Sequence, residues 1–67
     1  MSFNLILKEL RKERNLSQSQ LASVLSVDQT TIKNWEHGIN ETDFKMLCKI
    51  ANYFEVTVGQ LLGEEEY

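Results

Sequence analysis

Apolar residues recur at helical spacing near the start of the chain. Phe3, Leu7 and Leu10 are separated by four and then three residues. This spacing is typical of one face of an amphipathic helix, so a first helix is predicted over residues 3–14. Asn15 follows directly and is expected to end this helix, because asparagine tolerates the left-handed backbone conformation that closes many helices.

A capping pattern marks the start of a second helix. Ser17 is followed three residues later by Gln20, and the two side chains of such a pair can satisfy free backbone N–H groups at a helix start. The helix is predicted to run from Ser17 to residue 24 or 25. Its inward face is expected to consist of Leu21, Ala22 and Leu25.

The next two residues, 26–27, leave room only for a turn before a third helix. Asp28 is expected to cap that helix with its side chain, as aspartate often does. The helix should continue to about His37 and stop at Gly38. Ile32 and Trp35 lie three residues apart within it and are expected to anchor one face to the core.

Two further helices complete the pattern. A fourth is predicted over residues 43–54, and a fifth over residues 58–62, where Thr57 and Gln60 repeat the capping pattern. Cys48 flanks the apolar face of the fourth helix and is expected to be an inert core thiol. That face is expected to consist of Phe44, Leu47, Ile50, Ala51 and Phe54.

The expected fold is therefore all-α, a five-helix domain over residues 1–63. One core should contain Leu21, Ala22, Ile32, Trp35, Leu47 and Phe54. Leu5 points away from the first inward face, by roughly 160° around the helix. It is either a singly exposed leucine or a subunit contact, and Met46 and Tyr53, on the outer part of the fourth helix, pose the same choice.

The net negative charge argues less strongly against a nucleic-acid partner than its total suggests. The net charge is −3, but Glu64, Glu65 and Glu66 form a run in the final segment, residues 64–67, which is expected to be a solvated end. Without these three, the basic and acidic residues balance. Phosphate binding depends on the local field rather than on the total charge, so the balance does not exclude nucleic acid.

Other compositional features exclude several classes of protein. The single cysteine cannot form an internal disulfide, which favours a reducing cytoplasm. The longest apolar run, residues 5–7, is far too short to cross a membrane, and no signal peptide is expected. His37 stands alone without a ligand cluster, and no catalytic set is present, so no metal, cofactor, small-molecule substrate or enzymatic activity is expected.

One face of the third helix carries hydrogen-bonding groups. At roughly 100° per residue, these groups lie within an arc of about 140°, opposite Ile32 and Trp35. Amide side chains can pair with adenine, lysine can reach guanine, and a threonine methyl can contact thymine. Any exposed helix face is polar, however, so a merely solvated face is the alternative. The groups are Gln29, Thr30, Lys33, Asn34 and His37.

The sequence around this helix resembles the phage lambda-type repressor and Cro family, also called the XRE family. The resemblance lies in LKELRKERNLSQSQLASVLSVDQTTIKNWEHG, residues 7–38, and continues through LCKIANYFEVTVGQLL, residues 47–62. It implies a sequence-specific regulator of transcription, expected to be a repressor. Such a protein places its third helix in the major groove of double-stranded DNA, usually as a homodimer.

The resemblance also implies roles for individual residues. Gln18 matches a phosphate contact that often braces the residue opening the recognition helix, here Gln29. Arg11 and Glu36 match a pair that ties the first helix to the third. The base-reading positions correspond to Gln29, Thr30 and Asn34, with Lys33 close by, and His37 and Asn40 are further candidate DNA contacts.

The sequence departs from the family pattern at three positions, two of which, Ile39 and Glu41, weaken the expected grip on phosphate. Ser26 stands where glycine is usual, and a positive φ there would carry roughly 1 kcal/mol of strain. Ile39 and Glu41 occupy a loop that is often basic. The alternative function is therefore a protein-interaction module of the same fold, such as an antirepressor or an antitoxin-like partner.

Overall fold

The computed structural model describes residues 2–66, which contain five helices and no strand. The five-helix fold expected from the sequence is thus confirmed, and each predicted boundary is correct to within one residue. The helices are α1 (Phe3–Glu13), α2 (Gln18–Leu25), α3 (Gln29–Glu36), α4 (Phe44–Phe54) and α5 (Val58–Leu61).

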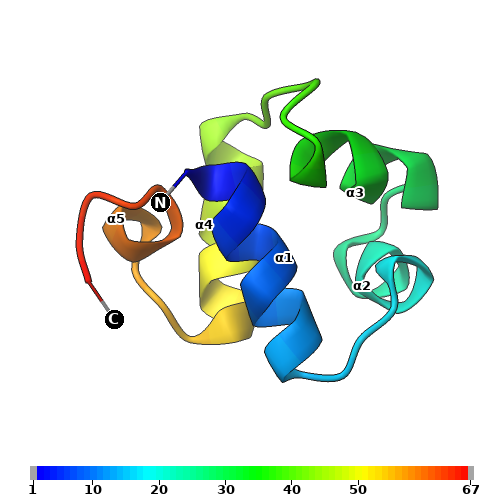
Figure 1. Cartoon of the computed structure of the whole chain (residues 1–67), viewed down its shortest axis with the longest axis horizontal. Coiled ribbons are helices and arrows are strands. Elements are labelled where there is room, and N and C mark those ends of the chain that lie inside the picture. The colour runs from blue at the N-terminus through cyan, green and yellow to red at the C-terminus, as the bar shows by residue number, and fades with distance from the viewer. Residues whose placement is uncertain (1, 67) are drawn as a thin grey trace.

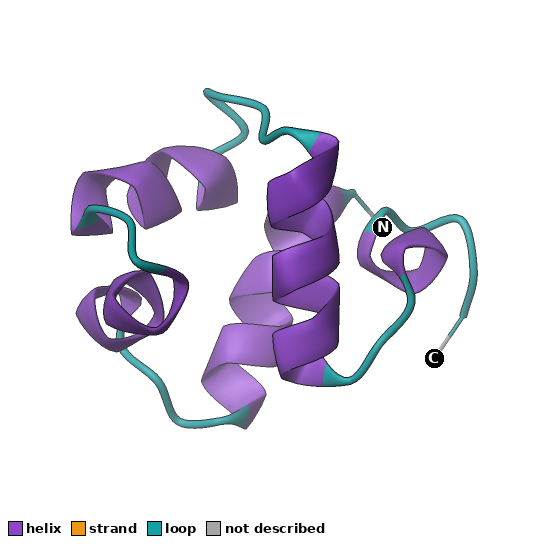
Figure 2. Ribbon diagram, turned by 180° about the vertical axis from the view of Figure 1, so that it is seen from behind, coloured by secondary structure: helices purple, strands orange, loops and turns teal. Residues whose placement is uncertain are grey.

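The two longest helices occupy the middle of the molecule. In Figure 1, α1 lies in front of α4, with α2 and α3 on one side and α5 on the other. The view from behind in Figure 2 shows the same order with α4 in front. Helix α3 packs on α2 and α1, and α5 packs on α4 and α1. The pair α2–α3 therefore lies at the opposite end of the molecule from α5.

The core is built from the inward face of every helix. Leu7, Leu21, Ile32, Ile50 and Leu61 are completely buried, and Trp35 is only 5% exposed. Five of the six expected core residues are buried, whereas Leu47 is half-buried at the edge of the core. No helix in the described range 2–66 is long and apolar enough to span a membrane.

The prediction for the outer edge of α4 was wrong at two positions. Phe44 is 69% exposed, and Cys48 is an exposed free thiol instead of a core residue. Ile50 and Phe54 define the inward direction of this helix. At roughly 100° per residue, Phe44 lies about 120° from Ile50, and Cys48 lies about 160° from it. The apolar face is therefore narrower than the sequence pattern indicated.

The remaining ambiguous apolar residues divide between surface and core. Leu5 is 49% exposed. Met46 and Tyr53 are half-buried and pack against the core. Tyr53 also lies beneath Arg14, whose guanidinium carbon is 5.7 Å from the ring centroid.

Two helices, α2 and α5, begin with the capping boxes that the sequence predicted. Ser17 with Gln20, and Thr57 with Gln60, each form a complete capping box. Asn15 takes a positive φ of 56° after α1, as expected. Ser26 has φ 59° at the end of α2, so the strain anticipated from replacing glycine is present.

The last described residues fold back onto α5 instead of extending into solvent. The Thr57 hydroxyl donates to Glu65 Oε1 at 2.8 Å, and the Glu64 N–H donates to the Gly59 carbonyl at 2.8 Å. A Cβ at Gly59 would overlap the Glu65 carboxylate. The acidic side chains are nevertheless exposed, as expected, and Tyr67, the last residue of the segment, lies outside the described residues.

Candidate DNA interface

Helix α3 presents the polar face that the sequence indicated. Gln29, Thr30, Lys33 and His37 are exposed, and Asn34 is half-buried, while Ile32 and Trp35 are buried on the opposite side. Four of the five predicted side chains thus belong to α3, and His37 directly follows the helix as its C-cap. Asn40 is also exposed, but it belongs to the loop between α3 and α4.

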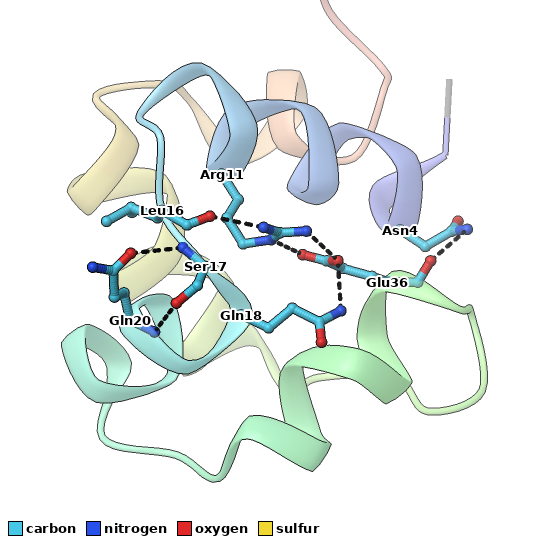
Figure 3. A network of polar contacts seen from close by, with 7 residues as sticks. All are labelled: Asn4, Arg11, Leu16, Ser17, Gln18, Gln20 and Glu36. Atoms are coloured by element: carbon cyan, nitrogen blue, oxygen red, sulfur yellow. Dashed lines mark hydrogen bonds and ion pairs between the residues drawn. The ribbon is translucent and has the colours of Figure 1, made fainter.

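A buried ion pair fixes α3 against α1, as Figure 3 shows. Arg11 donates from Nε to Glu36 Oε2 at 2.7 Å and from Nη2 to Glu36 Oε1 at 3.0 Å. The Glu36 side chain is only 1% exposed. Arg11 Nη1 also donates to the Leu16 carbonyl at 2.7 Å, so the guanidinium ties the α1–α2 turn to the same point. The predicted pair is therefore confirmed as a two-bond, buried contact.

Gln18 joins this network from the start of α2. Its Nε2 donates to Glu36 Oε1 at 3.1 Å, and its side chain is half-buried. The resemblance had suggested that Gln18 braces Gln29, but no hydrogen bond joins the two within residues 2–66. A carboxylate is a stronger acceptor than an amide oxygen, which explains the choice of Glu36. One of the two amide N–H donors of Gln18 remains for another partner.

Asp28 occupies the N-cap position of α3 but does not cap it. Its side chain accepts no hydrogen bond from the helix, and it is exposed. The Thr31 N–H, which an N-cap side chain would be expected to bind, donates instead to the Asp28 backbone carbonyl at 3.0 Å. The prediction that the Asp28 side chain is a cap is therefore wrong. Its position as the residue before the helix is correct.

The surroundings of α3 are electrically mixed. Lys33 is the only basic residue in the helix. Glu41 and Asp43 line a pocket of about 510 Å³ that also includes Thr31 of α3, so acidic groups flank one side of the helix. Ile39 in the same loop is 66% exposed. The loop thus supplies no positive charge, as the sequence suggested.

Two polar residues that the sequence analysis did not single out hold the α2–α3 unit in place. Lys49 Nζ donates to the Leu25 carbonyl at 2.9 Å, which ties α4 to the end of α2. Asn4 Nδ2 donates to the Glu36 carbonyl at 3.4 Å, near the end of α3. Both contacts join residues far apart in sequence, and no local pattern could have indicated them.

The chain matches a known protein family. Residues 7–61 match the helix-turn-helix family over most of the chain. The chain belongs to the helix-turn-helix family. Among relatives of this helix-turn-helix chain, the HTH-type transcriptional activator BcrR of Enterococcus faecalis is 42% identical over 66 residues, which are 98% of the chain and 32% of BcrR. The family expected from the sequence is thus confirmed.

Solved structures of a transcriptional regulator and of a repressor share the fold of this chain. A transcriptional regulator from Listeria innocua superimposes with a TM-score of 0.89 at 29% identity, over 98% of this chain and 62% of that one. The P22 c2 repressor, crystallised with a synthetic operator, gives a TM-score of 0.88 over 97% and 98% of the two chains. At 18% identity the second likeness shows the fold alone. The chain spans 32–58% of the lengths of the curated relatives that it matches.

Proposed function

We propose that this chain is a sequence-specific DNA-binding regulator that inserts α3 into the major groove of duplex DNA. The observation that carries the proposal is the exposed polar face of α3 opposite the buried Ile32 and Trp35. The buried pair of Arg11 and Glu36 supports it, because it holds that face in a fixed orientation. The name of BcrR as a transcriptional activator supports a role in transcription.

Within this proposal the residues divide into base-reading and phosphate-binding groups. Gln29, Thr30, Lys33 and Asn34 are assigned to base edges, which their amide, methyl and ammonium groups suit. Gln18 is assigned to a phosphate, since its free amide N–H lies at the start of α2, where backbone N–H groups also favour an anion. The groups at the other end of α3, His37 and Asn40, are assigned to flanking phosphates.

Selection from a random duplex pool tests the proposal. Wild-type protein should enrich a defined site, and its affinity should fall steeply as salt rises. Gln29→Ala should weaken binding to that site by about 1–3 kcal/mol. It should also relax the sequence preference at one base pair. Asn52→Ala is the control, because Asn52 is an exposed amide on α4. It should bind as the wild type does.

We also propose that two copies bind together. The electrically mixed surroundings of α3 predict weak binding by one copy, which a homodimer on two half-sites would offset. In repressors of this type the half-sites lie about one helical turn of DNA apart. A series of duplexes with varied half-site spacing should therefore show a sharp optimum. Equal affinity for duplexes with one and with two half-sites would contradict binding as a dimer.

We propose that the bound chain represses transcription. A bound domain excludes other proteins from the same stretch of DNA, which favours repression, whereas BcrR is named an activator. A reporter gene placed behind the selected site separates the two outcomes. A DNA partner suits the reducing cytoplasm expected from the single cysteine.

The second candidate is a protein-interaction module of the same fold. The exposed Ile39 and the acidic loop beside α3 favour it, because both oppose a phosphate contact. The same pool experiment decides between the two. If micromolar protein retains no duplex at low salt, and Gln29→Ala behaves as the wild type does, the DNA proposal fails and the protein partner takes its place.

A further inference from the structure

The free carboxylate of Asp28 is the feature that the proposed function does not yet use. Asp28 lies at the junction of the α2–α3 turn and the recognition helix, directly before Gln29. Its backbone carbonyl begins the helix by accepting from the Thr31 N–H at 3.0 Å and from the Ile32 N–H at 3.4 Å. Its side chain is exposed and makes no hydrogen bond to the helix end.

The other helix starts show that this is unusual for the chain. Ser17, Asp43 and Thr57 each accept a hydrogen bond from the backbone N–H three residues later, at 3.0, 2.8 and 2.9 Å. Asp43 has the same side chain and nearly the same extended backbone as Asp28, with ψ 169° against 151°. An aspartate can therefore cap a helix in this fold, but the one before the recognition helix does not.

We propose that Asp28 determines specificity by accepting a hydrogen bond from the exocyclic amino group of a cytosine in the major groove. This inference rests on the proposed function of α3. The N-terminal part of a recognition helix is the part that meets base edges. Aspartate accepts from cytosine N4, which offers a donor at the groove edge. Guanine in the same place offers only the acceptors O6 and N7, and a carboxylate repels them.

The same charge also works against DNA that lacks the correct base. A carboxylate near the duplex lowers affinity for any phosphate backbone, and only a donor placed opposite it offsets that loss. Asp28 therefore reduces binding to unrelated sequences more than binding to the selected site. Removing the carboxylate should raise non-specific affinity while it lowers discrimination.

The experiment compares Asp28→Ala with Asp43→Ala in the intact chain. Each protein is selected on a random duplex pool, and its urea unfolding midpoint is measured in parallel. Asp28→Ala should lose a preference for cytosine over guanine of about 5- to 100-fold at one base pair, and it should bind unrelated duplex more tightly. Its unfolding midpoint should stay close to that of the wild type. Asp43→Ala should keep the base preference and unfold at lower urea, because a capping bond is lost.

Two results overturn the inference in different ways. If the wild type selects a site and Asp28→Ala selects the same site with the same preferences, only the role of Asp28 fails. If Asp28→Ala unfolds as early as Asp43→Ala and keeps its preferences, Asp28 is a structural cap. If the wild type enriches no sequence, the proposed function fails, and the assignment of Asp28 fails with it.

Discussion

Glu36 is a charged residue whose side chain is only 1% exposed, and both side chains that donate to its carboxylate come from other helices. Arg11 reaches it from α1 and Gln18 reaches it from α2. A buried carboxylate is costly unless charged and hydrogen-bonded partners surround it. Here the two partners belong to α1 and α2, so hydrogen bonds to one side chain of α3 join all three helices.

Removing this carboxylate should be severe. Glu36→Ala leaves the Arg11 guanidinium buried without its partner, and the free energy of unfolding should fall by about 3–5 kcal/mol in a urea titration. Glu9→Ala is the matched control, since Glu9 is an exposed acid on α1. Its effect should stay within about 0.5 kcal/mol. Equal effects of the two substitutions would contradict a structural role for the ion pair.

A substitution at Ser26 should stabilise the protein, in contrast to Glu36→Ala. Its φ of 59° places a residue with a Cβ in the left-handed region, where glycine carries no such strain. Ser26→Gly should therefore raise the free energy of unfolding by roughly 0.5–1 kcal/mol. Ser23→Gly, inside α2, should lower it by about the same amount, because glycine weakens a helix interior. A loss of stability in both variants would show that the turn carries no strain.

At the scale of elements, local chemistry made most of the fold predictable. Two capping boxes and the apolar spacing placed the helices, because those signals depend on residues three or four apart. The partner of Gln18, the contact of Lys49 with α2 and the free carboxylate of Asp28 depend on residues brought together from different helices or on competition with a backbone group. No periodic pattern contains that information. The Arg11–Glu36 pair was predictable only through the family resemblance.

Helix α4 shows where periodicity fails. Its sequence offers a broad apolar face, and the width of the buried part depends on how many neighbours cover it. Phe44 lies at the first position of α4 and about 120° around the helix from Ile50, and it stays outside the core. The pattern alone could not separate Phe44 from Phe54.

The two phenylalanines of α4 provide a direct measurement of this difference. Phe54→Ala should lower the free energy of unfolding by about 3–5 kcal/mol, because Phe54 is buried. Phe44→Ala should change it by less than about 0.5 kcal/mol, because the ring is largely solvated already. Thermal unfolding of both variants checks the prediction. A large loss at Phe44 would mean that the side chain packs against something in solution.

At the scale of the molecule, the acidic segment lies far from the polar face of α3. The segment after α5 and helix α3 occupy opposite ends of a domain whose longest dimension is 27 Å (Figure 1). Charges in water are screened over about 8 Å at physiological ionic strength. The net charge of −3 therefore overstates the repulsion that a duplex at α3 would meet.

Neutralising the segment tests this separation. The double variant Glu64→Gln/Glu66→Gln should bind DNA within about twofold of the wild type at 0.15 M salt, and more tightly only at low salt, where screening is weak. Glu41→Gln is the control, because Glu41 lies in the pocket beside α3. It should raise affinity at both salt concentrations. If the double variant gains as much as Glu41→Gln at 0.15 M, the two ends are not independent.

Gly59 gives the segment after α5 its course. Alanine at this helical position would favour α5 by about 1 kcal/mol, yet its methyl group would occupy the space of the Glu65 carboxylate. The overlapping atoms belong to the end of a flexible, exposed side chain, so Glu65 can turn aside at little cost. The path on which the polypeptide leaves the domain is therefore held by the backbone, because the Glu64 and Glu65 N–H groups both donate to the Gly59 carbonyl, at 2.8 and 3.2 Å.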